Sequence, residues 1–593
     1  MQHTGTCFPG DVAERGIMTH EHAIQAGAWG TTFLGGTTWA VSLWAPSAKT
    51  VSVEVKGQET PLPLRDGGLF AGTFTGGPGD PYALIVDGQS QTDPAARALA
   101  DDATGSALLC LPVYRRIAAP RPDWAATVLL EIHIGTFTAE GTFAAAATRM
   151  AALAELGITA IEIMPVAAFP GQRGWGYDGV FPYAVHPAYG SPQDLSDMVD
   201  AIHEAGMLAI LDVVYNHFGP LGGSLDAIAP EFFDPDRTTP WGPGIDYTRA
   251  PVRRFFIDNA VMWVRDFGFD GLRLDAVHEI RDESDPHMLD QLAHAVRAAV
   301  PDRPVHLIAE DDRNLPHMRD RGSITACWND DYHHSMHCLL TGEDESYYAS
   351  FAVDPLSDLL RALAEGHVEQ GQPRPTRDTP RGEPTAHLPP QAFVNSNQTH
   401  DQVGNRAQGE RLIQLADPEA VRIAHAMLLS APAVPMLFMG EEEGARAPFL
   451  FFADFDGELG EAVRKGRAAE FAGFSQFGGD VPDPLAPETF AASRPYATPA
   501  PDADEWRALT RQCLTWRAAS LAPLLISGKS DTPQVRATGC ASLYGVWPFE
   551  AGRLEMVAHL GAVPDDAVSL DAPDLVLGQV SDPCHFAVKV TPR

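Results

Sequence analysis

Cysteine is scarce in this sequence, and its spacing argues against two common uses. The chain holds 7 cysteines, an odd number, with no C-x-x-C pair among them. A disulfide framework needs a paired set, and a structural zinc site needs closely spaced ligands. The pattern therefore predicts a reduced protein in the cytoplasm.

Basic residues and long apolar runs are also scarce. The chain carries 42 lysines and arginines against 78 aspartates and glutamates, a formal net charge of -36. Nucleic acid binding needs a clustered basic face, so we expect no nucleic acid partner and a neutral substrate. Residues 1–20 lack the apolar core of a secretory signal, and no later segment is apolar enough to span a membrane, so we expect no membrane partner.

The length of 593 residues predicts several domains, because it exceeds what one hydrophobic core supports. We expect a disordered leader at residues 1–27. Residues 28–115 contain short alternating apolar segments, which predict an N-terminal β-sandwich of immunoglobulin-like type. The alternation favours core packing over sugar binding for Trp39 and Trp44.

Residues 116–501 show a different pattern, in which apolar segments of strand length alternate with amphipathic segments of helix length. Eight such units close a (β/α)8 TIM barrel, which is the α/β fold that we predict for a catalytic domain. Two of the expected helices, 142–156 and 192–205, precede a glycine. The candidate strands are 128–136, 160–166, 209–216, 271–277, 306–311, 325–330, 393–401 and 434–441.

Two long connections and a last domain complete the expected layout. Residues 218–251 are rich in Gly, Pro and Asp and too long for an ordinary loop, which predicts a functional insertion at the barrel mouth. We expect residues 368–390 to be a mobile or lid-like loop. Residues 502–593 begin with one helix, and the short apolar runs after it predict a C-terminal antiparallel β domain.

The segment 268–280 places charge inside an apolar strand. Leu272 and Leu274 favour burial, yet Arg273 and Asp275 lie among them, and charged groups are costly to bury without partners. The two charged residues share a face of the strand, and an arginine favours the ionised carboxylate that a nucleophile needs. The segment alone fits either a buried ion pair or a catalytic site.

Acidic residues recur at the same end of several predicted strands. Asp212 and His217 end the third strand, Asp275 the fourth, Glu310 the fifth and Asp401 the seventh. A barrel needs none of these carboxylates for stability, and their repulsion is costly unless a reaction uses them. Barrel enzymes carry their active sites at the carboxyl ends of the strands, so we predict a catalytic site there.

Metal binding and glycoside hydrolysis both use such groups. A metal site would need paired histidines on one face, and His333, His334 and His337 come closest but lie apart from the main acids. Glycoside hydrolysis needs one ionised and one protonated carboxyl group. Asp275 suits the first role, and Glu310, crowded by other acids, suits the second. We therefore predict hydrolysis without a metal or another cofactor.

Four segments resemble, as a set, the signature regions of the α-amylase superfamily of retaining glycoside hydrolases. They are 212–217 (Asp-Val-Val-Tyr-Asn-His), 271–275 (Gly-Leu-Arg-Leu-Asp), Glu310, and His400 with Asp401. The resemblance implies that Asp275 is the nucleophile and Glu310 the general acid/base. It implies that Asp401 stabilises the transition state and holds sugar hydroxyls.

Finer motifs resemble the maltooligosyltrehalose trehalohydrolase family within that superfamily. They are 131–143, 328–334 with 339–342, 400–406, and 438–442 followed by 451–454. This family implies a maltooligosyltrehalose substrate, cut at the α-1,4 bond next to the terminal trehalose unit to give trehalose and a maltooligosaccharide. It also implies a functional pairing with maltooligosyltrehalose synthase.

The same resemblance implies a set of substrate-binding residues around the cleaved bond. Arg273, His217 and His400 would line the cleavage subsite, and Tyr177 would stack under the sugar ring. Flat aromatic side chains that could face other sugars are Trp175, Trp241, Tyr247 and Tyr332. The full substrate-binding set is Tyr177, Asp212, His217, Arg273, His278, Asn329, Asp330, Asp331, His333, His334, His400, Gln402, Asn405 and Arg406.

The sequence departs from the family pattern at a few positions. Thr399 stands where asparagine is expected, Glu443 stands where tryptophan is usual, and Ser396 and Asn397 stand where apolar residues are common. None of these is one of the three catalytic positions. The departures instead concern contacts that would read the trehalose end of the substrate.

Two other functions compete with this interpretation. One is another glucan-active enzyme, either a glycogen branching enzyme or an α-amylase-type glucanase. The branching enzyme would share the domain layout, although the motif 328–334 argues against it. A glycan-binding protein with an inactive barrel would lack at least one catalytic carboxylate, and Asp275, Glu310 and Asp401 are all present.

The nucleophile assignment predicts the behaviour of one variant. Asp275→Ala should still bind substrate but lose turnover by about 10³-fold or more, because the attacking group is gone. Steady-state kinetics together with a binding titration measure the two effects separately. Turnover close to that of the unmodified protein would contradict the assignment.

Overall fold

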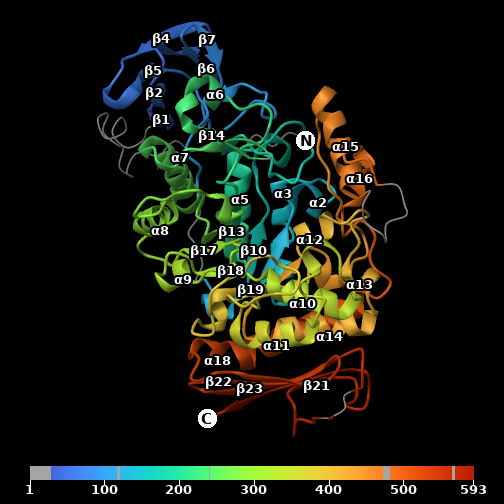
Figure 1. The fold of residues 1–593 in the computed structure, drawn as a ribbon. Coiled ribbons are helices and arrows are strands. Elements are labelled where there is room, and N and C mark those ends of the chain that lie inside the picture. Colours follow the sequence, from blue (N-terminus) through green and yellow to red (C-terminus); the bar gives the residue numbers. More distant parts are fainter. Residues whose placement is uncertain (1–28, 116–120, 240, 472–480, 564–565, 567) are drawn as a thin grey trace.

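The computed structural model describes residues 29–115, 121–239, 241–471, 481–563, 566 and 568–593. The predicted leader at residues 1–27 therefore lies outside the described residues. An N-terminal β region and a C-terminal β region lie at opposite ends of a central barrel (Figure 1). Within the described ranges, no helix is long and apolar enough to cross a membrane.

The N-terminal region is a β-sandwich, as the alternating pattern predicts. Trp39 and Trp44 are buried in its core, and each indole N–H donates to a backbone carbonyl at 3.0 Å, which confirms their packing role. One antiparallel sheet has the order β1 (Trp29–Gly35), β2 (Thr38–Trp44), β5 (Leu69–Thr75). The other has β4 (Gln58–Leu62), β3 (Val51–Val55), β6 (Pro81–Val86), β7 (Gln89–Gln91), with β8 (Ala107–Leu108) beside β6.

Eight parallel strands close into a barrel, which confirms the predicted fold of the central region. Every residue of these strands is buried, because helices cover the outside and side chains fill the inside. In order they are β9 (Leu129–Ile132), β10 (Ala160–Ile163), β13 (Leu208–Val213), β16 (Gly271–Leu274), β17 (His306–Ala309), β18 (Ala326–Trp328), β19 (Phe393–Ser396) and β20 (Val434–Phe438), which pairs with β9.

Two barrel strands stop just before an acidic residue. β16 ends at Leu274 and β17 ends at Ala309, so Asp275 and Glu310 are the first residues beyond them. The predicted strand ranges are longer, because the apolar pattern does not show where strand pairing ends. Side chains beyond the last paired residue leave the packed interior and face the barrel mouth.

One predicted helix is broken into two. Residues 142–156 form α3 (Phe143–Ala147) and α4 (Met150–Leu156). Between them, the N–H groups of Thr148 and Arg149 donate to carbonyls three residues back, at 3.2 and 3.0 Å. The prediction of a continuous helix is wrong there, because this tighter turn interrupts the α-helical hydrogen-bond pattern.

The other helices surround the barrel or follow its strands. α5 (Pro192–Glu204) forms as predicted, with a capping box at Ser191. The remaining ones are α2 (Ile134–Phe137), α6 (Leu225–Ile228), α7 (Ala250–Val261), α8 (Met288–Ala299), α9 (His317–Asp320), α10 (Asp330–Thr341), α11 (Pro355–Glu365), α12 (His400–Gly404), α13 (Leu412–Leu415), α14 (Pro418–Ser430), α15 (Gly457–Phe471), α16 (Pro487–Ala492), α17 (Ala503–Trp516) and α18 (Ala522–Ile526).

The insertion after the third barrel strand reaches the barrel mouth, as its length predicts. It contains α6 and a hairpin of β14 (Phe233–Thr239) and β15 (Gly242–Ile245). The Trp241 indole stacks on His217, with ring centroids 4.3 Å apart and planes at 21°. Trp241 remains 44% exposed, so this ring is available to a ligand.

Buried ion pairs anchor the Pro- and Arg-rich loop at 368–390. Glu369 is fully buried and pairs with Arg377 and Arg381. Asp331 accepts hydrogen bonds from the backbone N–H of Glu369 and of the residue before it, at 2.9 and 2.7 Å. The expectation of a mobile lid came from composition, which does not reveal these partners. The structure shows an anchored loop instead.

Helix α17 packs against barrel helices. His425 on α14 and Thr510 on α17 have side-chain atoms 2.9 Å apart. The buried Arg517, which follows α17, donates to the carbonyls of Leu429, Ala431 and Ala433 at 2.7–3.1 Å. We therefore propose that the domain boundary lies after α18 and not at residue 502.

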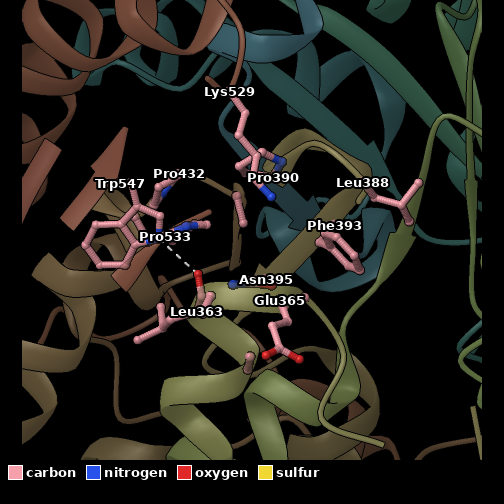
Figure 2. Close-up of a pocket in the computed structure, with 15 residues that line it drawn as sticks. Leu363, Glu365, Leu388, Pro390, Phe393, Asn395, Pro432, Lys529, Pro533 and Trp547 are labelled. Atoms are coloured by element: carbon pink, nitrogen blue, oxygen red, sulfur yellow. Dashed lines mark hydrogen bonds between the residues drawn. The ribbon is translucent and has the colours of Figure 1, made fainter. Parts of the chain in front are cut away.

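A five-stranded antiparallel sheet covers the amino-terminal end of the barrel strands. Trp547 donates from its indole N–H to the Leu363 carbonyl at 3.0 Å, beside a small cavity of about 30 Å³ (Figure 2). Phe393, the first residue of β19, lines that cavity. The sheet thus lies at the end opposite the acids. Its order is β21 (Gln534–Gly539), β22 (Ser542–Phe549), β23 (Gly552–Leu560), β25 (Cys584–Pro592), β24 (Leu575–Leu577).

The contacts of Arg517 predict a large stability effect. Arg517→Ala should lower the free energy of unfolding by about 3 kcal/mol, because three buried carbonyls lose their donor. Denaturant unfolding measures the change. Arg536→Ala, which removes an exposed ion pair with Asp566, is the control and should unfold as the unmodified chain does. Equal effects of the two substitutions would contradict this account.

Candidate active site

One buried arginine joins three carboxylates at the barrel mouth. Arg273 is 1% exposed and donates to Asp212 at 2.8 and 3.0 Å, to Asp275 at 2.7 Å and to Glu310 at 2.7 Å. Its guanidinium lies 4.2 Å from the centre of the Trp328 ring. The sequence left two alternatives for Arg273 and Asp275, a buried ion pair or a catalytic site. The structure shows a buried ion pair that belongs to the candidate site.

Strand pairing explains why these groups meet. Arg273 on β16 lies beside Asp212 on β13 and beside Ile308 on β17. Glu310 follows Ile308 by two residues, so it projects from the same face of the barrel wall. The register of three neighbouring parallel strands thus brings the carboxylates to one guanidinium.

Asp275 is held in the ionised state. Burial by itself would raise the pKa of Asp275, but the charge of Arg273, with His217 and the Asn216 amide, lowers it below its ordinary value. The Asn216 amide donates to Oδ2 of Asp275 at 2.6 Å and also to the backbone carbonyl of that residue at 2.8 Å. A fixed, ionised carboxylate is suited to nucleophilic attack.

Glu310 is held in the protonated state. Burial raises the pKa of Glu310 to about 8, against the opposing effect of Arg273 and with support from the charges of Asp275 and Asp401. The N–H of Ala276 donates to Oε2 of Glu310 at 2.8 Å. Ala276 adopts a left-handed conformation, with a φ of 38°, that is unfavourable for a residue with a side chain. The residue with the strained backbone, Ala276, is therefore the one whose N–H contacts the candidate acid Glu310.

Asp401 lies in the first turn of α12. The Asn405 amide donates to its Oδ1 at 2.8 Å. Thr399 caps the helix, because its hydroxyl accepts the N–H of Asp401 at 3.2 Å while Gln402 accepts the N–H of Thr399 at 3.1 Å. Thr399, which stands where asparagine is expected, thus serves as the N-cap of α12.

His400 and Tyr177 form one wall of the site. Their rings stack, with centroids 5.1 Å apart and planes at 22°. The Tyr177 hydroxyl donates to Asp212 at 2.6 Å, and Nε2 of His217 lies 3.0 Å from the Tyr177 carbonyl. Five residues of the predicted substrate-binding set, including Arg273, are therefore connected around the carboxylates.

Three residues predicted to bind substrate are instead buried behind the site. Asn329, Asp331 and His333 are 3%, 1% and 1% exposed. The Asn329 amide donates to Asn395 at 2.9 Å, Asp331 anchors the loop at 368–390, and His333 lies 2.8 Å from the Asn397 carbonyl. Because protein groups occupy their polar atoms, we propose that these three residues support the site and do not touch sugar.

The other predicted residues lie around the edge of the site. The Gln402 amide donates to Asp330 at 3.3 Å. Arg406 makes two bonds to Glu343, at 2.8 and 2.9 Å. His334 packs beside the rings of Tyr347, Tyr348 and Phe351.

The four predicted aromatic side chains comprise three buried residues and one exposed residue. Tyr247 and Tyr332 are 1% and 0% exposed and belong to the core, and Trp175 is 7% exposed. Trp241 is the member of this group that stays open to solvent. We therefore propose Trp241 alone among the four as a sugar-facing ring.

Within the described ranges, one group of three metal-ligand side chains lies close enough to share an ion. It consists of His278, Asp311 and Asp312, whose ligand atoms lie within 4.8 Å of one another. Arg313 already binds both oxygens of Asp311, at 2.7 and 2.8 Å. This arrangement resembles an ordinary ion pair between Arg313 and Asp311 beside a half-buried histidine. In the main carboxylate cluster, Arg273 supplies the positive charge.

Two residues of the site were missing from the predicted set. Glu131 on β9 binds His400, and Asn216 binds Asp275. Both lie within sequence segments that resemble the family, so the motifs contained them. The signal that marks Glu131 is a charged residue inside an apolar barrel strand, the same signal that marks Arg273.

The remaining departures lie outside the carboxylate cluster. Glu443 pairs with Arg507 at 3.0 Å. The carbonyl of Asn397 lies 2.8 Å from His333. Nothing in the structure explains the polar side chains of Ser396 and Asn397.

Comparison with known proteins identifies the family to which the chain is similar. Residues 104–222 match the family model described as Alpha amylase, catalytic domain. The chain is 42% identical to the malto-oligosyltrehalose trehalohydrolase of Deinococcus radiodurans over 80% of this chain and 79% of that protein. It is 35% identical to the malto-oligosyltrehalose trehalohydrolase of Rhizobium sp. (strain M-11) over 91% of this chain and 93% of that one.

A solved structure extends the similarity to the whole fold. The crystal structure of a putative alpha amylase from Salmonella typhimurium superposes with a TM-score of 0.89 at 40% identity. The match covers 95% of this chain and 99% of that chain. The terminal β regions are therefore part of the shared fold.

The opposite protonation states of the two carboxyl groups predict the pH dependence. The rate should fall as pH rises through about 8, because Glu310 then loses the proton that the leaving group needs. It should fall on the acid side only below the ordinary aspartate range, where Asp275 becomes protonated. Measurement of kcat/KM against pH checks both limbs.

A glutamine variant identifies the group behind the alkaline limb. Glu310→Gln should lower kcat by about 10²-fold or more and remove that limb, because the amide cannot donate a titrating proton. A residual activity with an unchanged alkaline limb would show that another group sets it.

Proposed function

The chain belongs to the family of malto-oligosyltrehalose trehalohydrolases, and we propose that it hydrolyses the α-1,4-glucosidic bond next to the terminal trehalose unit of maltooligosyltrehalose. It is a glycoside hydrolase of the α-amylase superfamily. The products are trehalose and a maltooligosaccharide. The observation that supports the chemistry most strongly is the contact of Arg273 with Asp212, Asp275 and Glu310.

The first step is a displacement at the anomeric carbon. A carboxylate oxygen of Asp275 attacks this carbon, and the bond from the carbon to the glycosidic oxygen breaks. Glu310 gives its proton to that oxygen, so the trehalose part leaves with a new hydroxyl group. The maltooligosaccharide part is then an ester of Asp275, and Glu310 is ionised.

The second step reverses these roles. Glu310 takes a proton from water, and the water oxygen attacks the anomeric carbon and displaces Asp275. The neutral ester no longer repels the charge on Glu310, which favours its ionised form at this stage. Two displacements at one carbon retain the configuration of that carbon.

The surrounding residues stabilise charge and position the sugar. Arg273 and Asp212 hold the two catalytic carboxyl groups in place. Asp401, near Glu310, stabilises the positive charge that develops on the sugar ring. Tyr177 offers a flat surface below this ring, and the stacked pair of Trp241 and His217 offers a second contact beside it.

The biological setting follows from the same family membership. A maltooligosyltrehalose synthase would supply the substrate, and a cytoplasmic location would fit the glucans it consumes. Neither physical association with the synthase nor a particular glucan length is needed for the chemistry.

Glycogen branching is the second candidate, because that reaction uses the same covalent intermediate and differs only in its acceptor. Purified protein incubated with maltooligosyltrehalose should release free trehalose, and incubation with amylose should give no new α-1,6 branches. Chromatography of both product mixtures distinguishes the two reactions. New branches on amylose without release of trehalose would reject the proposal in favour of transfer.

A further inference from the structure

Two buried glutamates lie on neighbouring strands inside the barrel. Glu131 on β9 and Glu162 on β10 are aligned in the parallel pairing, and each is 1% exposed. A buried carboxyl group is costly unless it has partners or is neutral. The two residues meet this requirement in different ways.

Glu131 binds His400, the first residue of α12. Its Oε2 accepts the backbone N–H of His400 at 2.9 Å, and its Oε1 binds Nδ1 of the same residue. One carboxylate therefore holds both the main chain and the ring of His400 at the start of α12. No hydrogen bond from the described residues reaches Nε2, the other ring nitrogen.

Several charged and titratable groups face the His400 ring. Burial alone would lower the pKa of His400, but the Glu131 carboxylate, with help from Asp401 and against Arg273, raises it above its ordinary value. The ring also packs on Tyr177, Trp175 and Trp328. The facing groups are Glu131 on β9, His133 after it, Asp212 on β13, Arg273 on β16 and Asp401 on α12.

We propose that Glu131 is a positioning residue for the reaction: it keeps the His400 ring as a donor at both nitrogens, so that its Nε2–H hydrogen-bonds a sugar hydroxyl at the cleavage subsite. The inference rests on the proposed function, since it assigns a role within that site. Glu131 acts through His400 and touches no substrate itself. A neutral partner at position 131 would leave the ring free to lose one proton and become an acceptor at Nε2.

Glu162 provides a matched control within the same layer of the barrel. Burial, together with the charges of Glu131 and Asp212, raises its pKa well above the ordinary range. It is therefore a neutral acid, and the indole of Trp328 is the hydrogen-bonding group that faces it. Glutamine has the same shape and charge as a protonated glutamate. Glu162→Gln should therefore leave the activity within about twofold.

The first experiment compares Glu131→Gln, Glu131→Asp and Glu162→Gln with the unmodified protein on maltooligosyltrehalose. Glu131→Gln should lower kcat by about 10- to 100-fold with a smaller change in KM, because the sugar contact strengthens in the transition state. Glu131→Asp keeps the charge and should recover part of the loss. Thermal melting of each variant shows whether the fold is intact.

The pH profile gives a readout that a purely structural role would not move. Removal of the carboxylate lowers the pKa of His400 below that of Glu310, so in Glu131→Gln kcat/KM should begin to fall on the alkaline side before the limb that Glu310 sets, whereas the profile of Glu162→Gln should stay in place. A double variant gives a further check. Glu131→Gln combined with His400→Gln should be no slower than His400→Gln alone, because the two residues act as a unit.

The outcomes separate this inference from the proposed function. If the unmodified protein releases no trehalose, the proposed function fails. If it does release trehalose, and folded Glu131→Gln retains its kcat and its alkaline limb, the role of Glu131 is overturned. A loss in Glu131→Gln that adds fully to that of His400→Gln would also overturn it.

Discussion

The guanidinium of Arg273 is the interaction on which the site depends. Asp212, Asp275 and Glu310 lie close together in a buried setting. Three ionised carboxylates would repel one another strongly there. Arg273 sits among them, fully buried, and binds each directly. Its charge lowers the pKa of Asp275 while burial keeps Glu310 protonated. One fixed cation thus allows a nucleophile and an acid to coexist beside each other.

The fold serves this arrangement by fixing strand register. The barrel aligns Asp212, Arg273 and Ile308 on neighbouring strands, and the two catalytic carboxyl groups follow directly after strand ends. The closure of β20 onto β9 brings Glu131 close to His400. The C-terminal sheet packs at the opposite end of the barrel, away from the carboxylate cluster.

Much of this architecture could be predicted because it depends on local pattern. Apolar runs separated by helix-length segments were enough to identify all eight barrel strands, and polar residues after those runs indicated the active end. The contacts that residues make with partners far away in the sequence could not be predicted from local pattern. Nothing local distinguishes Asn329, which bonds to Asn395, from Asn216, which bonds to Asp275. The anchored loop around Glu369 depends on arginines that only the folded chain brings together.

The central claim is that Asp275 forms a covalent bond to the sugar during turnover. A fluorinated maltosyl fluoride forms this intermediate readily but slows its hydrolysis, so the sugar should accumulate on the enzyme. Digestion and mass spectrometry of the labelled protein locate the attachment. We predict one maltosyl group on the peptide that contains Asp275. A label on any other residue would contradict the account, as would an active enzyme that hydrolyses the reagent with inversion and is never labelled.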